Sequence, residues 1–153
     1  MYCAKDLGGV YMNEYTFDEI PIGHTESFTK EITIAMEDAF REITGDLNPL
    51  HRDDKFAMDV GDGRFKGHVS FGMLTASLYS TFAGVYLPGK YSLIHSLDKI
   101  TFKKPVFAGD VLTVTGIVHA KQEDLRLLQI GVKIINQNKK VVSTADMKVL
   151  VQK

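Results

Sequence analysis

Alternating hydrophobic and polar residues predict β-strands in the second half of the chain. Leu128, Ile130, Val132 and Ile134 alternate with polar or small residues, which is the period of a strand with one buried face. A polar stretch at 136–140 and a second alternating segment ending near residue 151 complete a predicted hairpin. Three further segments favour strands, which gives an antiparallel sheet of about five strands: 25–33, 92–103 and 110–119.

Two other segments have helical periodicity. In the first, about 34–44, apolar residues recur at helical spacing and Gly45 follows as a stop signal; the apolar residues are Met36, Ala39, Phe40 and Ile43. The second, about 71–86, mixes large apolar residues with Gly, Ala and Ser and has no charged residue, so we expect it to be buried on nearly all sides. A buried helix combined with antiparallel strands predicts an α+β domain, with the sheet wrapped around a central helix. Edge-to-edge pairing of two protomers would cover the exposed sheet edges.

Composition limits the class of protein. With 153 residues, 44% hydrophobic and 24% charged, we expect one domain over 1–153 with a substantial core. The net charge of −1 gives no reason to expect nucleic acid or an anionic membrane as a partner. The single cysteine, Cys3, is expected to be a surface thiol, and no pair of histidines has the spacing of metal ligands, so no metal is expected. Without an apolar run of membrane-spanning length or a signal peptide in the first twenty residues, a cytoplasmic location is expected.

The loop after the first helix contains the most informative residues. Gly45 allows a left-handed exit from the helix, and Pro49 prevents the helix from continuing. The loop therefore holds Asp46 and His51 five residues apart. A carboxylate and an imidazole that converge on one water form an acid–base pair. On spacing alone, an ordinary turn aspartate and an ordinary loop histidine are the more common explanation.

The start of the second helix offers the other half of a site. We expect Ser70 to cap this helix and to leave the N–H groups of Phe71, Gly72 and Met73 without intrahelical partners. Such amides, with the helix dipole behind them, suit a carbonyl oxygen that gains negative charge. The alternative is that Gly72 only permits close packing of the helix.

Three blocks of sequence together resemble the MaoC-like (R)-specific enoyl-CoA hydratase and acyl dehydratase family. In chain order they are Gly45-Asp46-x-Asn48-Pro49-Leu50-His51-x-Asp53, then Phe65, Val69 and Gly72-Met73-Leu74, and then Pro105-Val106-Phe107-x-Gly109-Asp110. The resemblance extends from about residue 17 to 150, and it implies a dimeric hot-dog fold, in which an antiparallel sheet wraps around a long helix.

The resemblance also implies an activity, namely reversible syn addition of water to a trans-2-enoyl thioester to give an (R)-3-hydroxyacyl thioester. The substrate would be an acyl-CoA or an acyl-carrier-protein thioester, with no cofactor. Asp46 and His51 match the catalytic pair, the Gly72 N–H would bind the thioester oxygen, and Asn48 would brace the loop. Ser80 falls where the family carries a serine near its active site, and Ala83 would help to line the acyl pocket.

One position departs from the family pattern. Phe71 stands where the family usually has a histidine before the central helix. The departure puts any polar role for that position in doubt, but it leaves Asp46, His51 and the Gly72 amide unchanged.

Two other functions remain as alternatives. A hot-dog thioesterase would attack the carbonyl carbon, and such enzymes often carry an acidic residue on the central helix, whereas 71–86 contains none. A non-catalytic module that binds acyl thioesters is supported only by Phe71, and the intact Asp46 and His51 argue against it.

Overall fold

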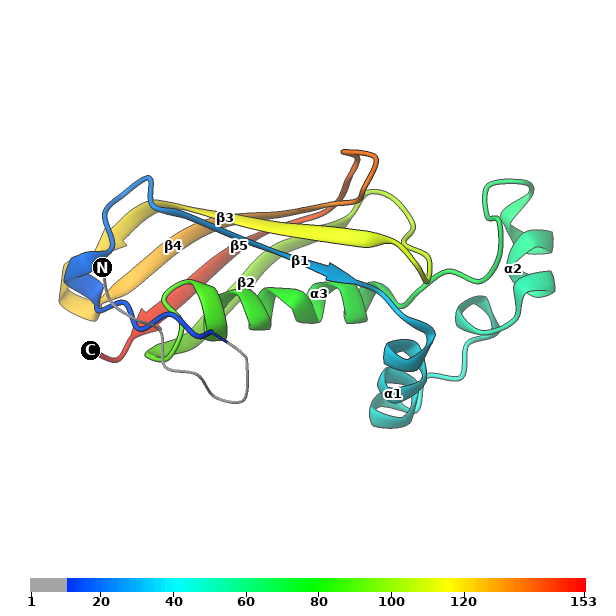
Figure 1. Ribbon diagram of the computed structural model, residues 1–153, viewed down its shortest axis with the longest axis horizontal. Coiled ribbons are helices and arrows are strands. Elements are labelled where there is room, and N and C mark those ends of the chain that lie inside the picture. Colours follow the sequence, from blue (N-terminus) through cyan, green and yellow to red (C-terminus); the bar gives the residue numbers. More distant parts are fainter. Residues whose placement is uncertain (1–10) are drawn as a thin grey trace.

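The computed structural model describes residues 11–153. Cys3, expected to be a surface thiol, lies outside these residues. A five-stranded antiparallel sheet forms most of the structure, in the order β1-β3-β4-β5-β2 (Figure 1). The strands confirm the five predicted segments: β1 (Thr25–Glu31), β2 (Ser92–Phe102), β3 (Val111–Gln122), β4 (Leu127–Ile135) and β5 (Val141–Val151).

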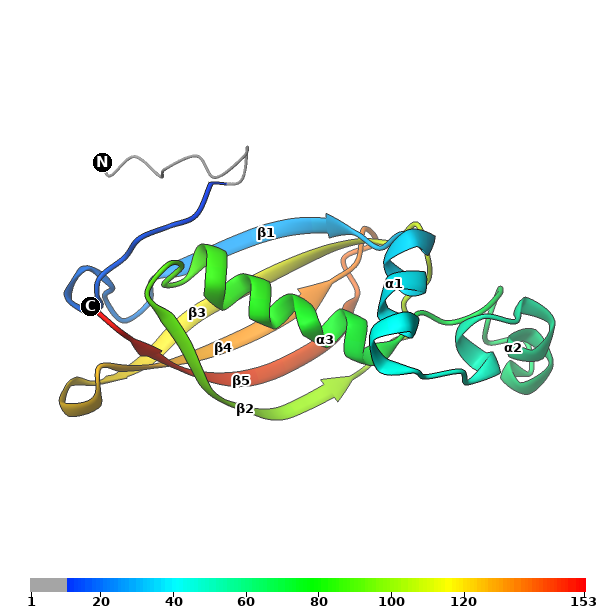
Figure 2. The same ribbon diagram turned by 90° about the horizontal axis from the view of Figure 1, so that it is seen from below.

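The central helix lies along one face of this curved sheet (Figure 2). It comprises α3 (Gly72–Thr81) and a π-helical turn at Phe82–Tyr86, which together match the predicted segment 71–86. Phe82 is fully buried, and a Cβ at Gly116 of β3 would lie 2.4 Å from its ring, so glycine is what allows the helix to approach the sheet here. On the same helix, the Tyr79 hydroxyl forms a buried hydrogen bond of 2.7 Å with the Ser143 hydroxyl of β5. The expected α+β arrangement, a sheet wrapped around a helix, is confirmed.

The expectation that this helix is buried on nearly all sides is wrong for the single chain. Met73 is 60% exposed, and Ser77 and Ser80 are exposed on the same face of α3. The sheet covers only one side of α3, and within residues 11–153 no other strand or helix lies over the opposite side (Figures 1 and 2). One chain therefore leaves an uncharged helix face in solvent.

Two short helices project beyond the end of the sheet, the first next to the N-terminus of α3 and the second farther out (Figure 2). The helix α1 (Ile34–Thr44) has the predicted bounds, and it ends at Gly45 with a left-handed φ of 71°. Its buried face differs from the predicted one, because Ile43 is 81% exposed and Glu37 is only 1% exposed. The helix α2 (Asp54–Gly61), capped by the Asp53 side chain, is not predicted by the sequence pattern. No helix within 11–153 is long and apolar enough to span a membrane.

Candidate active site

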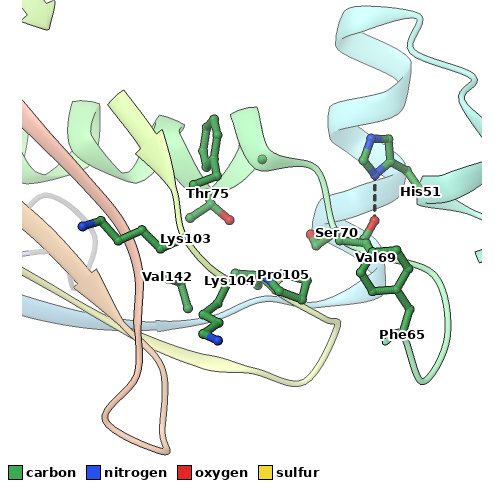
Figure 3. A pocket seen from close by; sticks show the side chains of 12 residues that line it. His51, Phe65, Val69, Ser70, Thr75, Lys103, Lys104, Pro105 and Val142 are labelled. Carbon is green, nitrogen blue, oxygen red and sulfur yellow. Dashed lines mark hydrogen bonds between the residues drawn. The ribbon is translucent and has the colours of Figure 1, made fainter. Parts of the chain in front are cut away.

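A cavity of about 330 Å³ lies beside the N-terminus of α3 (Figure 3). The loop before α3, its first turns and the chain that follows β2 form its walls. Of the predicted site residues, His51 and Gly72 line it. The complete lining is mostly apolar: His51, Phe65, Val69, Ser70, Gly72, Thr75, Phe102, Lys103, Lys104, Pro105, Val106 and Val142.

The His51 ring is held in one orientation by the backbone. Asn48 caps the 3-10 turn Pro49–His51, because its side-chain oxygen accepts a hydrogen bond from the Leu50 N–H at 3.0 Å. The Nδ1 atom of His51 lies 2.7 Å from the Val69 carbonyl oxygen (Figure 3). A carbonyl can only accept, so Nδ1 carries the proton in this contact. The Nε2 atom is therefore the nitrogen that can take or give a proton.

Phe71 packs directly against this histidine. Its side chain is 2% exposed, and its ring centroid lies 4.3 Å from that of His51 and 5.2 Å from that of Phe40. Phe71 thus supports the imidazole as an apolar neighbour and joins it to α1. The structure gives this position a packing role in place of the polar role of the family's histidine.

The N-terminus of α3 lacks the predicted cap. Phe71, not Ser70, is the N-cap residue, and no side chain caps the helix. The Gly72 N–H, at the first helical position, therefore has no intrahelical partner. The prediction that Ser70 caps the helix is wrong, because the Ser70 hydroxyl belongs to the cavity lining instead.

Two hydroxyl groups that sequence reasoning did not assign to the site line this cavity. Ser70 is 3% exposed and Thr75 is 2% exposed, and within residues 11–153 neither hydroxyl has a hydrogen-bond partner. Buried hydroxyls are normally paired, so two free ones in one cavity are suited to a polar ligand. The sequence indicates them only by their position, as polar residues within or beside a helix that packs on a core.

The other predicted residues lie outside this cavity. Asp46 is exposed, and one of its carboxylate oxygens accepts the Asn48 N–H at 3.0 Å. Ser80 is exposed near the far end of α3, and Ala83 is fully buried in the π-helical turn. The single chain thus brings His51, Gly72 and the Phe71 ring together, whereas Asp46, Ser80 and Ala83 do not line the cavity.

A second cluster of ionisable groups lies beside the cavity. His68 bridges two carboxylates, with its Nδ1 atom 2.6 Å from Asp54 Oδ1 and its Nε2 atom 2.8 Å from Glu37 Oε2. Burial by itself would lower the pKa of His68, but the hydrogen bonds and negative charges of Asp54 and Glu37 outweigh burial and raise it above 6.5. The same contacts lower the pKa of Asp54. Sequence reasoning did not find this cluster, because its members are 14 and 31 residues apart.

No group of three or more potential metal-ligating side chains with suitable geometry is found in the described range 11–153.

Comparisons with known proteins agree on one family. The family model for the MaoC like domain matches residues 18–142. The (R)-specific enoyl-CoA hydratase of Aeromonas caviae is 34% identical over 127 residues, which cover 83% of this chain and 92% of the relative. A 3-hydroxybutyryl-CoA dehydratase of Methylorubrum extorquens is 35% identical over 98 residues, which cover 64% of this chain and 60% of the relative.

Solved structures show the same similarity. The (R)-hydratase from A. caviae superposes with a TM-score of 0.78 at 32% identity, covering 86% of this chain and 97% of that one. The unliganded R-hydratase PhaJ1 from Pseudomonas aeruginosa gives a TM-score of 0.80 at 26% identity, covering 89% and 84%. The expected hot-dog fold is thereby confirmed.

The His68 cluster predicts how stability changes with pH. A histidine whose pKa is raised by folding stabilises the fold fully below its unfolded value of about 6.5, and this contribution is lost as pH rises through the folded pKa. The free energy of unfolding should fall over this range, by at most about 1.4 kcal/mol per pH unit for one proton. Urea unfolding followed by circular dichroism at fixed protein concentration measures it.

The matched variants are His68→Gln and His119→Gln, the latter at an exposed histidine on β3. His68→Gln should flatten the pH dependence above pH 6.5, and His119→Gln should retain it. An equal slope in His68→Gln and the unsubstituted protein would contradict the pairing.

Proposed function

The chain belongs to the MaoC-like family, and on that premise we propose that it hydrates trans-2-enoyl thioesters reversibly to (R)-3-hydroxyacyl thioesters. The similar proteins named above are hydro-lyases, and this chain is a hydro-lyase of the same kind. The observation that carries the proposal is the cavity in which the oriented His51 ring and the unpartnered Gly72 N–H lie together.

The apolar lining supports an acyl substrate. Phe65, Phe102 and Val142 are among the apolar residues that line the cavity, and such a lining suits an acyl chain. A Cβ at position 72 would lie 3.4 Å from the Phe102 ring, so glycine leaves room for a thioester between that ring and the helix backbone.

Hydration requires two proton transfers, which we assign to His51, in the cavity, and to Asp46, which matches the family motif but does not line the cavity of the single chain. Asp46 is the base: it takes one proton from water while the oxygen forms a bond to C3. His51, as the imidazolium, donates a proton from Nε2 to C2 as the enolate collapses. Its Nδ1–H keeps the bond to the Val69 carbonyl in both charge states, so the ring does not turn during the cycle. Proton exchange with solvent then restores the Asp46 carboxylate and the His51 imidazolium, and dehydration is the reverse of these steps.

The negative charge that develops on the thioester oxygen is placed at the start of α3. The Gly72 N–H points along the helix axis, where the helix dipole favours an anion. The free hydroxyls of Ser70 and Thr75 lie in the same cavity and can donate to that oxygen or hold the attacking water. Preformed donors of this kind lower the barrier for enolate formation.

Substitution of the proposed pair tests the mechanism. Asp46→Asn and His51→Gln should each lower kcat for crotonyl-CoA by about 100-fold or more, the usual scale of acid–base catalysis. Loss of the enoyl-thioester ultraviolet absorbance measures the rate, and chiral analysis of the product should show the (R)-alcohol.

Two substitutions of the same chemical kind serve as controls. Asp59→Asn removes an exposed carboxylate of α2, and His119→Gln removes an exposed imidazole of β3; both should keep near-normal rates. Near-normal rates in Asp46→Asn or His51→Gln would refute the assigned roles.

The charge around the cavity supports coenzyme A as the carrier. Lys103 and Lys104 line the cavity (Figure 3). Phe65 and Pro105 also line a neighbouring pocket, to which Arg64 and Lys66 contribute. The single carboxylate of that pocket, Asp110, is buried and already accepts bonds from Phe107 and Gln137. The rim is therefore cationic although the whole chain has a net charge of −1, which suits the phosphates of CoA.

Removal of this rim charge should weaken CoA binding without slowing the chemistry. The double variant Lys66→Ala/Lys104→Ala should raise KM for crotonyl-CoA about 2- to 30-fold, because exposed ion pairs contribute about 0.2–1 kcal/mol each. Neither kcat nor the KM for crotonyl-pantetheine, which lacks the nucleotide phosphates, should change. Lys90→Ala is the control, since Lys90 lies beyond the other end of α3 and pairs with Glu14 at 3.2 Å. Equal effects on both substrates would argue against a phosphate contact.

A second copy of the chain is the proposed partner of the uncovered helix face. The exposed face of α3 has no charge, and β2 is an edge strand whose Leu93 and Phe102 are 54% and 49% exposed. Uncharged surface beside an open sheet edge is what a homodimer interface requires. Ser80 lies on this face, so if Ser80 belongs to the active site, it would do so at the dimer interface.

Sedimentation tests the dimer. The unsubstituted protein should sediment at twice the 17.1 kDa chain mass. Ser77→Lys puts a charge into the helix face that the second copy would cover, so this variant should sediment more like a monomer. Gln129→Lys adds the same charge at an exposed position of β4 and should leave the dimer intact. A monomeric unsubstituted protein would rule the dimer out.

A further inference from the structure

The chain segment 68–70 determines where the His51 ring is held. Each residue of this segment is fixed by a backbone hydrogen bond: the His68 N–H donates to Asp54 Oδ1 at 2.8 Å, the Val69 N–H to the Leu50 carbonyl at 2.9 Å, and the Ser70 N–H to the Val106 carbonyl at 2.7 Å. The Val69 carbonyl in turn accepts the His51 Nδ1–H at 2.7 Å. Any shift of Val69 therefore reaches the imidazole directly.

We propose that His68, clamped between Glu37 and Asp54, is a positioning residue that holds the Val69 carbonyl against His51. The proposal rests on the function proposed above only for its kinetic part. His68 does not line the cavity and would touch no reacting atom. It acts on the site through its neighbour in the chain, and it ties that neighbour to α1 through Glu37 and to α2 through Asp54.

The burial of Glu37 makes this clamp strong. Its side chain is only 1% exposed, and a buried carboxylate requires a cation or donors close by. Arg41, one helical turn later, does not serve it: the guanidinium bonds Asp38 at 2.7 Å and the His51 carbonyl at 3.3 Å. The His68 Nε2 atom, at 2.8 Å, is the partner that Glu37 has within residues 11–153.

The clamp needs both protons of the His68 ring. An imidazolium donates from Nδ1 to Asp54 and from Nε2 to Glu37 at once, whereas a neutral imidazole has one N–H and can serve one of them. The charged groups that act on the ring are Glu37 of α1 and Asp54 of α2. Loss of one His68 proton would leave either Glu37 or Asp54 without its donor from the ring, so the 68–70 segment would be tied to only one of the two helices and kcat should fall at alkaline pH.

Two double variants that differ only at residue 68 isolate the clamp. Both carry Glu37→Gln, which removes the buried negative charge, so the protein can still fold when residue 68 no longer supplies a cation. In Glu37→Gln/His68→Gln the two amides can still hydrogen-bond, so we expect most of the kcat for crotonyl-CoA at neutral pH and no alkaline loss from residue 68. In Glu37→Gln/His68→Ala the link is gone, so kcat should fall about 10-fold or more with KM changed little. Glu42→Gln, an exposed glutamate of the same helix, should keep the alkaline limb of the unsubstituted protein.

A spectroscopic readout tests the positioning without any substrate. Two-bond ¹H–¹⁵N correlation spectra of histidine-labelled protein distinguish the Nδ1–H from the Nε2–H tautomer, and a His51→Gln spectrum identifies the His51 signals. Neutral His51 should be the Nδ1–H tautomer in the unsubstituted protein and in Glu37→Gln/His68→Gln, and a mixture of tautomers in Glu37→Gln/His68→Ala.

The outcomes separate this proposal from the proposed function. An Nδ1–H tautomer of His51 retained in Glu37→Gln/His68→Ala, or an unchanged kcat in that variant, would overturn the positioning role. Failure of the unsubstituted protein to hydrate crotonyl-CoA would count against the function alone. The tautomer comparison would then still decide the positioning role.

Discussion

The structure depends on the burial of a helix that has no charged side chain. The antiparallel sheet curves around α3 and covers the face that carries Tyr79 and Phe82, and Gly116 lets the helix approach closely. This packing determines where everything else can be. The uncapped N-terminus of α3 lies at the end of the sheet. There α1 and the 68–70 segment lie beside it, and α2 lies farther out (Figure 2). The opposite face of α3 is left for another surface.

The parts of the fold that follow a local period could be predicted, and the parts that depend on distant contacts could not. Strands with one buried face and a helix without charges show themselves in consecutive residues, so β1–β5, α1 and α3 lie where the sequence indicates. Nothing in the consecutive residues of the first helix marks Glu37 as buried, because its partner His68 is 31 residues away. The contact between His51 and Val69 spans 18 residues. The helix α2 was missed because Phe56, Met58 and Val60 stay 40–48% exposed and mark no clear buried face.

The sequence predicts some residues of the candidate site, but not how all of them are arranged. The family motif identified His51 and Gly72, which share the cavity, whereas the free hydroxyls of Ser70 and Thr75 emerged only from their burial without partners. Phe71 shows how one change is absorbed. Its ring fills the space between His51 and Phe40, so the imidazole has an apolar wall beside it and its hydrogen bond comes from the backbone instead.

The Gly72 amide also has a consequence for how the sequence can diverge. A hydrogen-bond donor that belongs to the main chain is encoded by the path of the backbone, and only proline at that position abolishes it. The side chains around it can therefore drift without removing the donor. Position 71 can hold a phenylalanine in place of the family's histidine, and residues 70 and 75 can change, while the main-chain N–H proposed to bind the thioester oxygen stays in place. Substrate range and chemical competence are thus free to evolve at different rates in this scaffold.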